Sequence, residues 1–270
     1  MDSALQIGPF ALRWYGLIIA VGALAASQLA YIEARRRGEN ADHVLNILVF
    51  AIIAGIIGAR TYHVIHQWDH YSRYPLEIVG VSQSAAGGFT GLAGLGIFGA
   101  IAGGALAIIL YARHQHLNVG TWLDIAAPGL ALAQAIGRWG NFINQELYGP
   151  PTDLPWGIYI APEHRLPGWQ SYERFHPLFA YESAWNLFTC AFLLFLGRRF
   201  GARLLPGDVT LGYLILYPLG RFALEPLRTD NWMVGQMATA QLVSLAAIAF
   251  AVIVLVARHR LRPQAKPQHG

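Results

Sequence analysis

The residues best suited to chemistry lie in one short stretch, Gly137–Gly149, which follows an apolar run of the chain. It contains an arginine, two asparagines, a glutamine, a glutamate and a tyrosine, spaced among three glycines. An arginine binds phosphate or carboxylate oxygens through two parallel hydrogen bonds, and glycine lets the backbone turn sharply or approach a ligand closely. The stretch therefore predicts an anion site centred on Arg138. The alternative is an ordinary polar loop, since loops are normally polar.

Three further charges, Arg221, Glu225 and Arg228, lie in or beside another apolar segment. Their spacing of four and three residues puts all three on one face of a predicted helix. Ionisable side chains inside membrane spans are costly and usually functional. A structural salt bridge between Arg221 and Glu225 is the alternative, but this face carries two positive charges for one negative.

Arg60 and Arg138 add to these arginines, so we predict a cationic cluster that Glu146 and Glu182 offset only in part. An excess of arginine within a membrane requires an anionic partner, and the nearest abundant one is a phospholipid head group. The formal net charge of +4 does not indicate nucleic-acid binding, because the basic residues cluster between apolar segments or stand beside polar motifs.

A third group of polar residues precedes the next apolar segment, in the run His176–Glu182. Pro177 suits the first turn of a helix, so Tyr181 and Glu182 should fall in that turn, beside the head-group layer. Because histidine exchanges protons near neutral pH, His176 is a candidate general base. A hydrogen bond that only fixes the start of the helix is the alternative for this histidine.

No metal site is predicted. Two histidine pairs lack the further histidine or carboxylate ligand that would complete a zinc site; they are His63 with His66 and His114 with His116. The single cysteine, Cys190, lies in an apolar run, where a thiol is poorly ionised and mainly packs. We therefore expect neither a disulfide nor a catalytic thiol, and we predict no cofactor.

The composition predicts an all-α, polytopic integral membrane protein. Of the 270 residues, 55% are hydrophobic and 13% are charged, whereas soluble domains are about 25% charged. The apolar residues form long blocks rather than a scattered core pattern. We expect one transmembrane domain, residues 1–270, with seven spans near residues 14–32, 44–64, 89–112, 122–136, 178–197, 209–227 and 237–257.

Two of these predicted spans have features of their own. The third is rich in glycine, and small residues spaced three or four apart let helices approach closely in lipid. The fourth is shorter than the ~20 residues that a span needs. It must borrow length from the motif that follows, which places Arg138 at or just below the interface. A polar insert, at about residues 137–177, then separates the fourth span from the fifth.

The arginines also predict an orientation. Cytoplasmic loops collect lysine and arginine, and with seven spans the clusters after spans one, five and seven all lie on one side, together with Arg113. That side is then cytoplasmic and contains the C-terminus. The N-terminus and the insert face outward.

Taken together, these motifs resemble the prolipoprotein diacylglyceryl transferases, bacterial enzymes of the cell inner membrane. Residues 137–149 match the family pattern Gly-Arg-x-Gly-Asn-Phe-x-Asn-x-Glu-x-x-Gly at each fixed position. Other similar segments follow in the family's order, so the likeness covers nearly the whole chain: they are residues 13–16, 58–60, 176–182 and 217–230.

The resemblance implies a reaction and a set of functional residues. The family moves a diacylglyceryl group from phosphatidylglycerol to the lipobox cysteine thiol in a prolipoprotein signal peptide, and glycerol phosphate leaves. It implies functional roles for Tyr15, Arg138, Asn141, Glu146, Gly149, Arg221 and Glu225.

Physical reasoning extends this set, because the phosphate must be bound and the thiol must lose its proton. Arg228 and Arg60 would support the phosphate-binding arginines, and Asn144 would help to orient the head group. His176 or Glu182 would take the proton, with Tyr181 beside them.

One position departs from the family's pattern. Many members have a histidine at the start of the third span, where this chain has Phe98. If that histidine were an obligatory base, this protein would be inactive or would use another group; we expect a divergent branch that does without it. A rival hypothesis is a lipid flippase or anion carrier, whose site would lie near the bilayer midplane between repeated halves. We find no internal repeat in the sequence.

Overall fold

The structure is a computed structural model that describes residues 4–7, 10–79, 81–82, 88–89, 96–229, 231 and 233–261. Its elements are mostly helices, joined by short segments that include small two-stranded hairpins. The chain divides into two compact units, one made of residues 1–30 and 124–270 and the other of residues 31–123. The division falls inside helices α1, Trp14–Arg36, and α5, Val119–Asn144.

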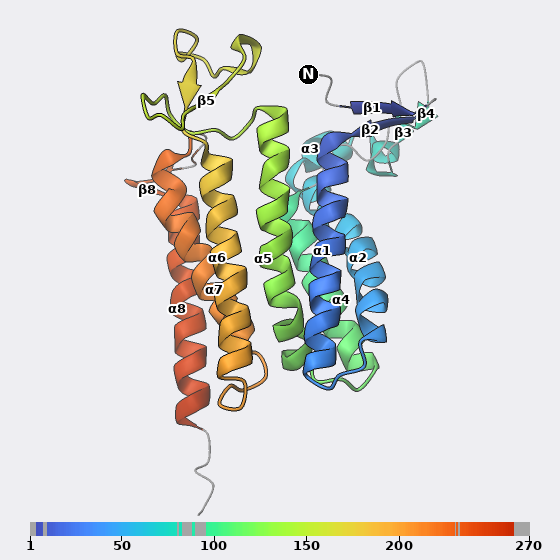
Figure 1. Ribbon diagram of the computed structural model, residues 1–270. Coiled ribbons are helices and arrows are strands. Elements are labelled where there is room, and N and C mark those ends of the chain that lie inside the picture. The colour runs from blue at the N-terminus through green and yellow to red at the C-terminus, as the bar shows by residue number, and fades with distance from the viewer. Residues whose placement is uncertain are drawn as a thin grey trace, which may run out of the picture. The chain divides into compact units, whose positions relative to one another are not determined.

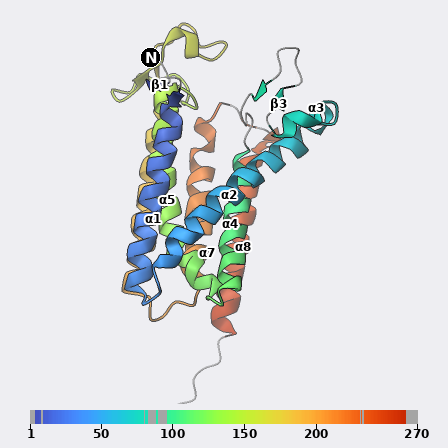
Figure 2. The same cartoon turned by 90° about the vertical axis from the view of Figure 1, so that its right-hand side faces the viewer.

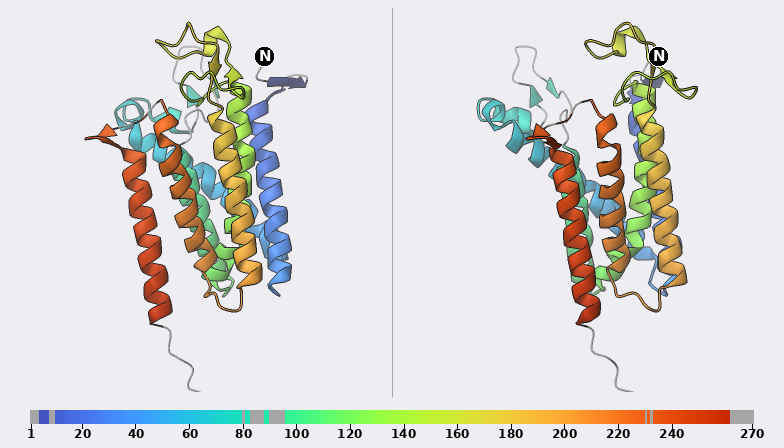
Figure 3. Two further views of the ribbon diagram at one scale, coloured as in Figure 1. Left: turned by 60° about the vertical axis from the view of Figure 1, so that its left-hand side comes forward. Right: turned by 90° about the vertical axis from the view of Figure 1, so that its left-hand side faces the viewer.

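The larger unit contains the N-terminal part of α1, most of α5, and three further long helices. These are α6, Leu178–Arg199, α7, Asp208–Leu224, and α8, Thr239–Arg260. Figures 1 and 3 show α7 running beside both α6 and α8. A 3-10 helix, η3, Glu225–Leu227, follows α7 directly. The unit also contains the polar insert, described below, and two further hairpins: β1, Ala4–Ile7, with β2, Phe10–Arg13, and β7, Met233–Val234, with β8, Met237–Ala238.

The core of this unit lies where α5, α6 and α7 meet. Buried alanines of α5 pack there against larger side chains of the other two helices, namely Cys190, Leu193, Val209 and Tyr213. Cys190 is thus a packing residue, as predicted. Helix α1 approaches α5 closely, because a Cβ atom on Gly129 would lie 2.7 Å from the carbonyl oxygen of Ala26. Glycine therefore sets the spacing of these two helices.

A pair of buried carboxylates fixes the start of α7. Asp124 of α5 accepts hydrogen bonds from the backbone N–H groups of Gly207 and Thr210, both at 2.8 Å. Asp208 is hydrogen-bonded to His259 Nε2 at 2.7 Å and forms an ion pair with Arg258 at 3.4 Å, near the end of α8. Negative charge is favoured at a helix N-terminus, where backbone N–H groups lack partners. This cluster therefore joins α5, α7 and α8 at one end of the unit.

The polar insert, residues 145–177, lies between α5 and α6 (Figure 1). Its hairpin pairs β5, Ile158–Tyr159, with β6, Arg174–Phe175, and a short 3-10 helix, η2, Pro162–His164, lies between them. Tyr148, Ile160 and Phe175 form a small buried core of its own. The insert is thus a folded element and not an open loop.

The smaller unit, residues 31–123, is built on two helices, α2, Asp42–His66, and α4, Ile97–His114 (Figure 2). A Cβ atom on Gly99 would clash with the carbonyl group of Gly58, and one on Gly103 with that of Ala54. The expected close packing through glycine is confirmed at these positions. The short elements between the helices are α3, Trp68–Tyr71, η1, Pro75–Val79, β3, Val81–Ser82, and β4, Gly88–Phe89.

The prediction of a mostly helical, polytopic membrane protein is confirmed. Within the described residues, five helices are long and apolar enough to cross a bilayer: α1, α2, α5, α6 and α8. They have 22 to 26 residues, which at ~1.5 Å per residue exceeds the ~30 Å hydrocarbon layer. Many of their large apolar side chains are exposed, as expected for surfaces that contact lipid tails.

Two predicted boundaries were wrong. The third span was expected to begin at Phe89, but that residue pairs in β4 and helix α4 begins only at Ile97. The insert was expected from residue 137, but α5 continues as a regular helix to Asn144. Two glycines of the motif, Gly137 and Gly140, therefore lie inside a helix and do not form turns. The predicted third span began before α4 does, and the apolar run of the fourth stops before α5 ends, so composition alone misplaced both boundaries.

Candidate active site

Three arginines converge on one carboxylate, that of Glu182 near the start of α6. Arg138 of α5 places its Nε 2.7 Å from Glu182 Oε2. The guanidinium nitrogens of Arg221 and Arg228 lie 3.3 and 3.1 Å from Glu182 Oε1. Each arginine comes from a different segment, so this carboxylate joins α5, α6 and the end of α7.

The cluster is accessible on its cationic side. The side chains of Arg138 and Arg221 are 22% and 20% exposed, whereas that of Glu182 is 6% exposed. Glu225 adds an ion pair with Arg221 at 2.8 Å. Glu182 and Glu225 carry one negative charge each, so by themselves they do not offset three guanidinium groups. An anion that reached the site would meet arginines before it met a carboxylate.

The predicted helical face of Arg221, Glu225 and Arg228 is only partly correct. Helix α7 ends at Leu224, and Arg228 follows η3 in an extended conformation. The chain turns tightly after Arg221 but still returns Arg228 to Glu182. The prediction failed because Pro226, the second residue of η3, has no N–H to continue the helix.

A chain of hydrogen bonds runs from Arg138 through the rest of the motif. Arg138 donates to Asn141 Oδ1 at 3.5 Å, and the Asn141 amide donates to Glu146 Oε1 at 3.0 Å. Asn144 donates to the same oxygen at 3.3 Å. Glu146 is thus bound to asparagines of the motif, which hold it in the helix-end turn.

That turn has an uncommon backbone. Gln145 and Leu147 have φ angles of 51° and 53°, a left-handed conformation that costs free energy for residues with a Cβ atom. The Gln145 side chain accepts a hydrogen bond from the backbone N–H of Ala161 at 2.7 Å, which anchors the turn to the insert. The strained turn lets the chain reverse at once after α5, so Glu146 folds back beside Asn141.

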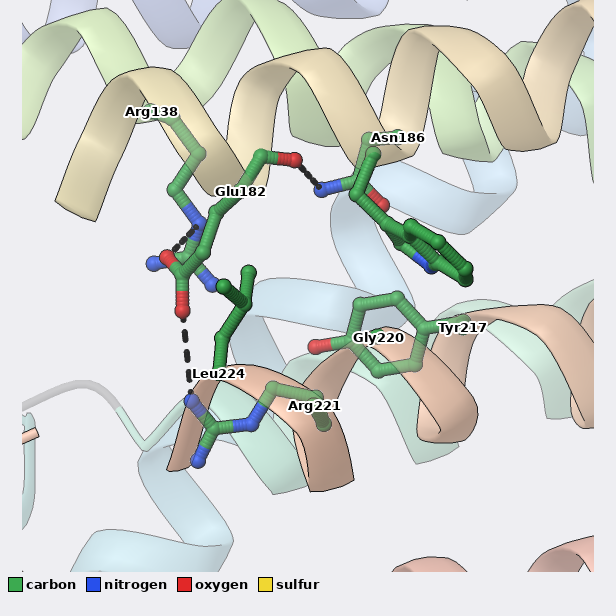
Figure 4. Close-up of a pocket in the computed structure, with 8 residues that line it drawn as sticks. Arg138, Glu182, Asn186, Tyr217, Gly220, Arg221 and Leu224 are labelled. Carbon is green, nitrogen blue, oxygen red and sulfur yellow. Dashed lines mark hydrogen bonds and ion pairs between the residues drawn. The ribbon is translucent and has the colours of Figure 1, made fainter. Parts of the chain in front are cut away.

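The arginine cluster borders a small pocket between α5, α6 and α7 (Figure 4). Figure 4 shows Glu182 between Arg138 and Arg221 at one end of the pocket. The other lining residues are Trp185, Asn186, Tyr217, Gly220 and Leu224. Sequence reasoning did not select Asn186 or Tyr217 as site residues. Their spacing could have identified them. Each lies four residues from a charged residue of the cluster, Glu182 or Arg221, and therefore on the same helical face.

His176 belongs to a separate hydrogen-bonded group. The indole N–H of Trp156 donates to the Tyr181 hydroxyl at 2.8 Å, and that hydroxyl lies 3.2 Å from His176 Nδ1. An indole nitrogen only donates, so the Tyr181 hydroxyl accepts from Trp156, and it either donates to His176 Nδ1 or accepts from it, according to the tautomer of His176. The contact orients the His176 ring beside Tyr181 and leaves His176 a candidate both as a base and as a donor.

The two remaining motif positions of this unit have packing roles. The backbone N–H of Gly149 donates to the carbonyl of His176 at 2.9 Å, and a Cβ atom there would lie 2.8 Å from the His176 Cβ. Gly140 faces the ring of Tyr15, whose Cδ2 would be 2.5 Å from an added Cβ. Both glycines permit a close contact that any side chain would disturb.

Arg60 was expected in the same cationic cluster, and it lies in the smaller unit. There it donates to the carbonyl oxygens of Ile78 and Glu77, the former at 2.9 Å, and its guanidinium lies 5.0 Å from the ring centre of Tyr71. These contacts hold η1 against α2. The side chain of Phe98 and all of Asp230 lie outside the described residues.

The fold and the site define a class of protein: a polytopic membrane protein with a partly exposed arginine site among its helices. A carboxylate holds the arginines together, and the pocket beside them is also lined by Trp185, Tyr217 and Leu224. Such a site suits an amphipathic anion, whose charged part binds the arginines while its apolar part contacts the helices.

The chain belongs to the prolipoprotein diacylglyceryl transferase family, whose profile matches residues 2–257. It is 43% identical over 255 residues to the phosphatidylglycerol–prolipoprotein diacylglyceryl transferase of Synechococcus elongatus, covering 93% of this chain and 85% of the relative. It is 42% identical over 273 residues to the enzyme of that name from Chloroflexus aggregans, covering 93% and 87%. The Gloeobacter violaceus enzyme is 41% identical over 252 residues, covering 93% and 90%.

Proposed function

We propose that this protein transfers the diacylglyceryl group of phosphatidylglycerol to the lipobox cysteine thiol of a prolipoprotein, the first step of lipoprotein maturation. Glycerol phosphate is the leaving group. The observation that carries this proposal is the convergence of Arg138, Arg221 and Arg228 on one carboxylate at a partly exposed pocket between apolar helices. The names of the relatives supply the substrates.

The arginines have two roles in this proposal. They bind the lipid phosphate, with Arg138 and Arg221 as the principal ligands and Arg228 in support. They also stabilise the negative charge that develops on the phosphate as the carbon–oxygen bond breaks. Fixed cations in a site of low dielectric stabilise such charge strongly, because little solvent must reorganise. Glu182 holds the three guanidinium groups in place before the lipid arrives.

The reaction also requires that the thiol lose its proton, because the thiolate is the nucleophile. The sulfur forms a bond to the glyceryl carbon as the oxygen leaves with its electron pair, and the thiol proton goes to a base. Neighbouring arginines favour the thiolate. His176 or Glu182 takes this proton. Glu182 is already paired with three arginines, and His176 has its Nδ1 beside the Tyr181 hydroxyl.

The test is a transfer assay with purified protein, phosphatidylglycerol and a synthetic lipobox peptide. Release of glycerol phosphate together with a diacylglyceryl-modified peptide is the expected result. Movement of lipid across the bilayer without release would instead support the flippase or carrier hypothesis. A peptide with alanine in place of the lipobox cysteine is the matched control, and release in its presence would contradict transfer to the thiol.

We further propose that all seven long helices cross the bacterial inner membrane, with the N-terminus outside and the C-terminus cytoplasmic. Helices α4 and α7 are the shortest, with 18 and 17 residues. The arginines at the ends of α1, α6 and α8 support this orientation through the positive-inside rule. A Thr152→Cys protein should react with an impermeant thiol reagent in cells whose outer envelope is permeable. Labelling only after the inner membrane is broken would contradict the orientation.

A further inference from the structure

One buried acceptor in the pocket has no partner. Asn186 lies one turn after Glu182 on α6 and is 3% exposed, yet its side-chain oxygen Oδ1 accepts no hydrogen bond. The orientation of the amide is fixed, because its Nδ2 donates to the backbone oxygen of Glu182 at 2.8 Å. Exchanging the two amide atoms would bring two oxygens together. The acceptor therefore faces away from that carbonyl.

An acceptor of this kind is unfavourable unless something donates to it. Leucine has nearly the same shape as asparagine and would fill the position without an unmet hydrogen bond. The pocket lining includes Asn186, and Figure 4 shows it on the side of Tyr217 and Gly220, away from the arginines. The geometry thus points to a ligand that brings a hydrogen-bond donor into this part of the pocket.

The chemistry of the proposed substrates restricts which group can be the hydrogen-bond donor to Asn186. The arginines bind the phosphate, and Asn186 is nearer the middle of α6 than Glu182 is, so it lies on the acyl-chain side of a bound phosphate. On that side phosphatidylglycerol carries only ester oxygens, which accept and do not donate. Its hydroxyl donors are in the glycerol head group, on the other side of the phosphate. A donor near Asn186 must therefore come from the second substrate.

The geometry of the displacement identifies the group. Sulfur replaces the phosphate oxygen on the glyceryl carbon, and in an in-line displacement the nucleophile approaches from the side opposite the leaving oxygen. The leaving oxygen is held at Arg138 and Arg221, so the thiol approaches from the side of the pocket where Asn186 lies.

We propose that Asn186 Oδ1 accepts a hydrogen bond from the lipobox thiol and positions its sulfur for attack. This inference rests on the proposed function. Asn186 is then a substrate-binding residue for the peptide, and the base that removes the proton remains a separate group. An asparagine oxygen suits this role because it accepts a hydrogen bond without adding a negative charge that would oppose formation of the thiolate.

The experiment compares the parent protein with Asn186→Leu in detergent, using two lipobox peptides that carry cysteine or alanine at the modified position. We expect Asn186→Leu to lower kcat/KM for the cysteine peptide by about three- to tenfold, the range of one neutral hydrogen bond. Its affinity for the unreactive alanine peptide should stay within about twofold of the parent. An equal loss with both peptides would overturn the assignment to the thiol.

A second comparison separates lipid recognition from peptide recognition. Phosphatidylpropanol lacks the head-group hydroxyls of phosphatidylglycerol. If Asn186 binds the thiol, the ratio of rates with the two lipids is the same in Asn186→Leu as in the parent. If that ratio moves towards one, Asn186 binds a head-group hydroxyl and the proposal is wrong. Unchanged kcat/KM for the cysteine peptide would also overturn it.

Two controls keep these outcomes distinct. Thr189→Val removes another buried unpartnered oxygen of α6, outside the pocket lining, and should leave both peptides unaffected. Asn186→Ala serves as the second variant if the leucine protein does not fold, which its thermal unfolding reveals. If the parent protein transfers nothing, the proposed function fails. The affinities of the two peptides for the parent and Asn186→Leu proteins still show whether Asn186 contacts the thiol.

Discussion

Two charged clusters lie at opposite ends of α5, α6 and α7, and they differ in what binds their charges. At one end Asp124 and Asp208 accept hydrogen bonds from backbone N–H groups at and just before the first turn of α7. At the other end three arginines share Glu182, and the guanidinium groups of Arg138 and Arg221 are about one-fifth exposed. The first cluster binds backbone N–H groups as well as the side chains of Arg258 and His259, whereas the carboxylate of the second is held by side chains.

The difference separates a structural cluster from a binding site. Backbone donors are part of the helix and cannot be exchanged for a ligand without unfolding a turn. Side chains that meet at a pocket present donors that an anion can reach without unfolding a turn. We therefore expect changes at the aspartates to alter stability, and changes at the arginines to alter turnover. Each prediction below tests that division, from the largest effect to the smallest.

Substitution of Arg138 should have the largest effect on catalysis. Lysine keeps the charge but lacks the planar fork that binds two phosphate oxygens. A charge-assisted hydrogen bond contributes roughly 1.5–3 kcal/mol, so Arg138→Lys should lower turnover roughly ten- to a hundredfold. Turnover of Arg138→Ala should be lower still, because the charge is lost as well. The measurement is glycerol phosphate release by purified, folded variants. Activity of Arg138→Lys within about twofold of the parent would remove this residue from the site.

Substitutions of Arg221 and Glu225 test whether Arg221 binds the lipid phosphate or only forms a structural salt bridge. If the pair is only structural, Arg221→Leu combined with Glu225→Leu should recover much of the activity that either change loses alone, because no charge is left unpaired. We expect instead that Arg221→Leu stays at least about tenfold below the parent in both backgrounds. Recovery in the double variant would place Arg221 with the structural cluster.

Glu182 and Asp208 form a matched pair of buried acids. Glu182→Gln should lower the free energy of unfolding by about 3–5 kcal/mol, because it leaves three largely buried guanidinium groups without their carboxylate. Asp208→Asn should cost less, because its partners Arg258 and His259 are 35% and 38% exposed. Phosphatidylglycerol should restore part of the thermal stability of Glu182→Gln, since its phosphate replaces the lost charge and binding stabilises the folded state. Phosphatidylglycerol should raise the thermal stability of Asp208→Asn by no more than it raises that of the parent protein. Equal rescue of both would erase the distinction between the clusters.

Gly149 should show a smaller, indirect effect. A Cβ atom in Gly149→Ala would press on His176 and on the carbonyl of Leu227, just before Arg228. We expect turnover to fall by about three- to tenfold, with an unfolding free energy within about 1 kcal/mol of the parent. Gly168→Ala is the matched control, because nothing lies within 4 Å of its added methyl, although its φ of 87° itself disfavours alanine. An equally large loss of turnover in Gly168→Ala would show that any disturbance of the insert lowers turnover, and that the contact of Gly149 with His176 is not the cause.

Substitution of Trp156 should have the smallest effect, and it tests whether the contact with Tyr181 positions His176. Trp156→Phe keeps the ring but removes the N–H that binds the Tyr181 hydroxyl. The Tyr181 hydroxyl is then held less firmly beside His176, and we expect turnover to fall by only about two- to threefold. Trp169→Phe, another aromatic residue of the insert, should leave turnover unchanged. If both variants behave alike, His176 is not positioned through this contact.

The sequence predicted the helices and the chemistry of the site better than its connections. Arg138, Arg221, Arg228 and Glu182 were all named as site residues because charged side chains in apolar segments are rare enough to be noticed. Their meeting point was not predictable, since Glu182 was expected to offset charge in part and to take the thiol proton, but not to bind all three arginines. Which carboxylate lies between three arginines depends on how α5, α6 and α7 are rotated, and periodicity does not give that rotation. Asn186 was not selected for a similar reason: the sequence does not show whether a side chain is buried or which hydrogen-bond partners it lacks.

Helix α5 carries a residue of each cluster, and this constrains how the chain can change over evolution. Asp124 and Arg138 are 138 − 124 = 14 positions apart, which in an α-helix is about 21 Å along the axis and about 40° short of four full turns. Both therefore face the same neighbouring helices. One inserted or deleted residue between them would turn Arg138 by about 100° relative to Asp124. We expect relatives to vary in sequence across this segment but to keep its length constant.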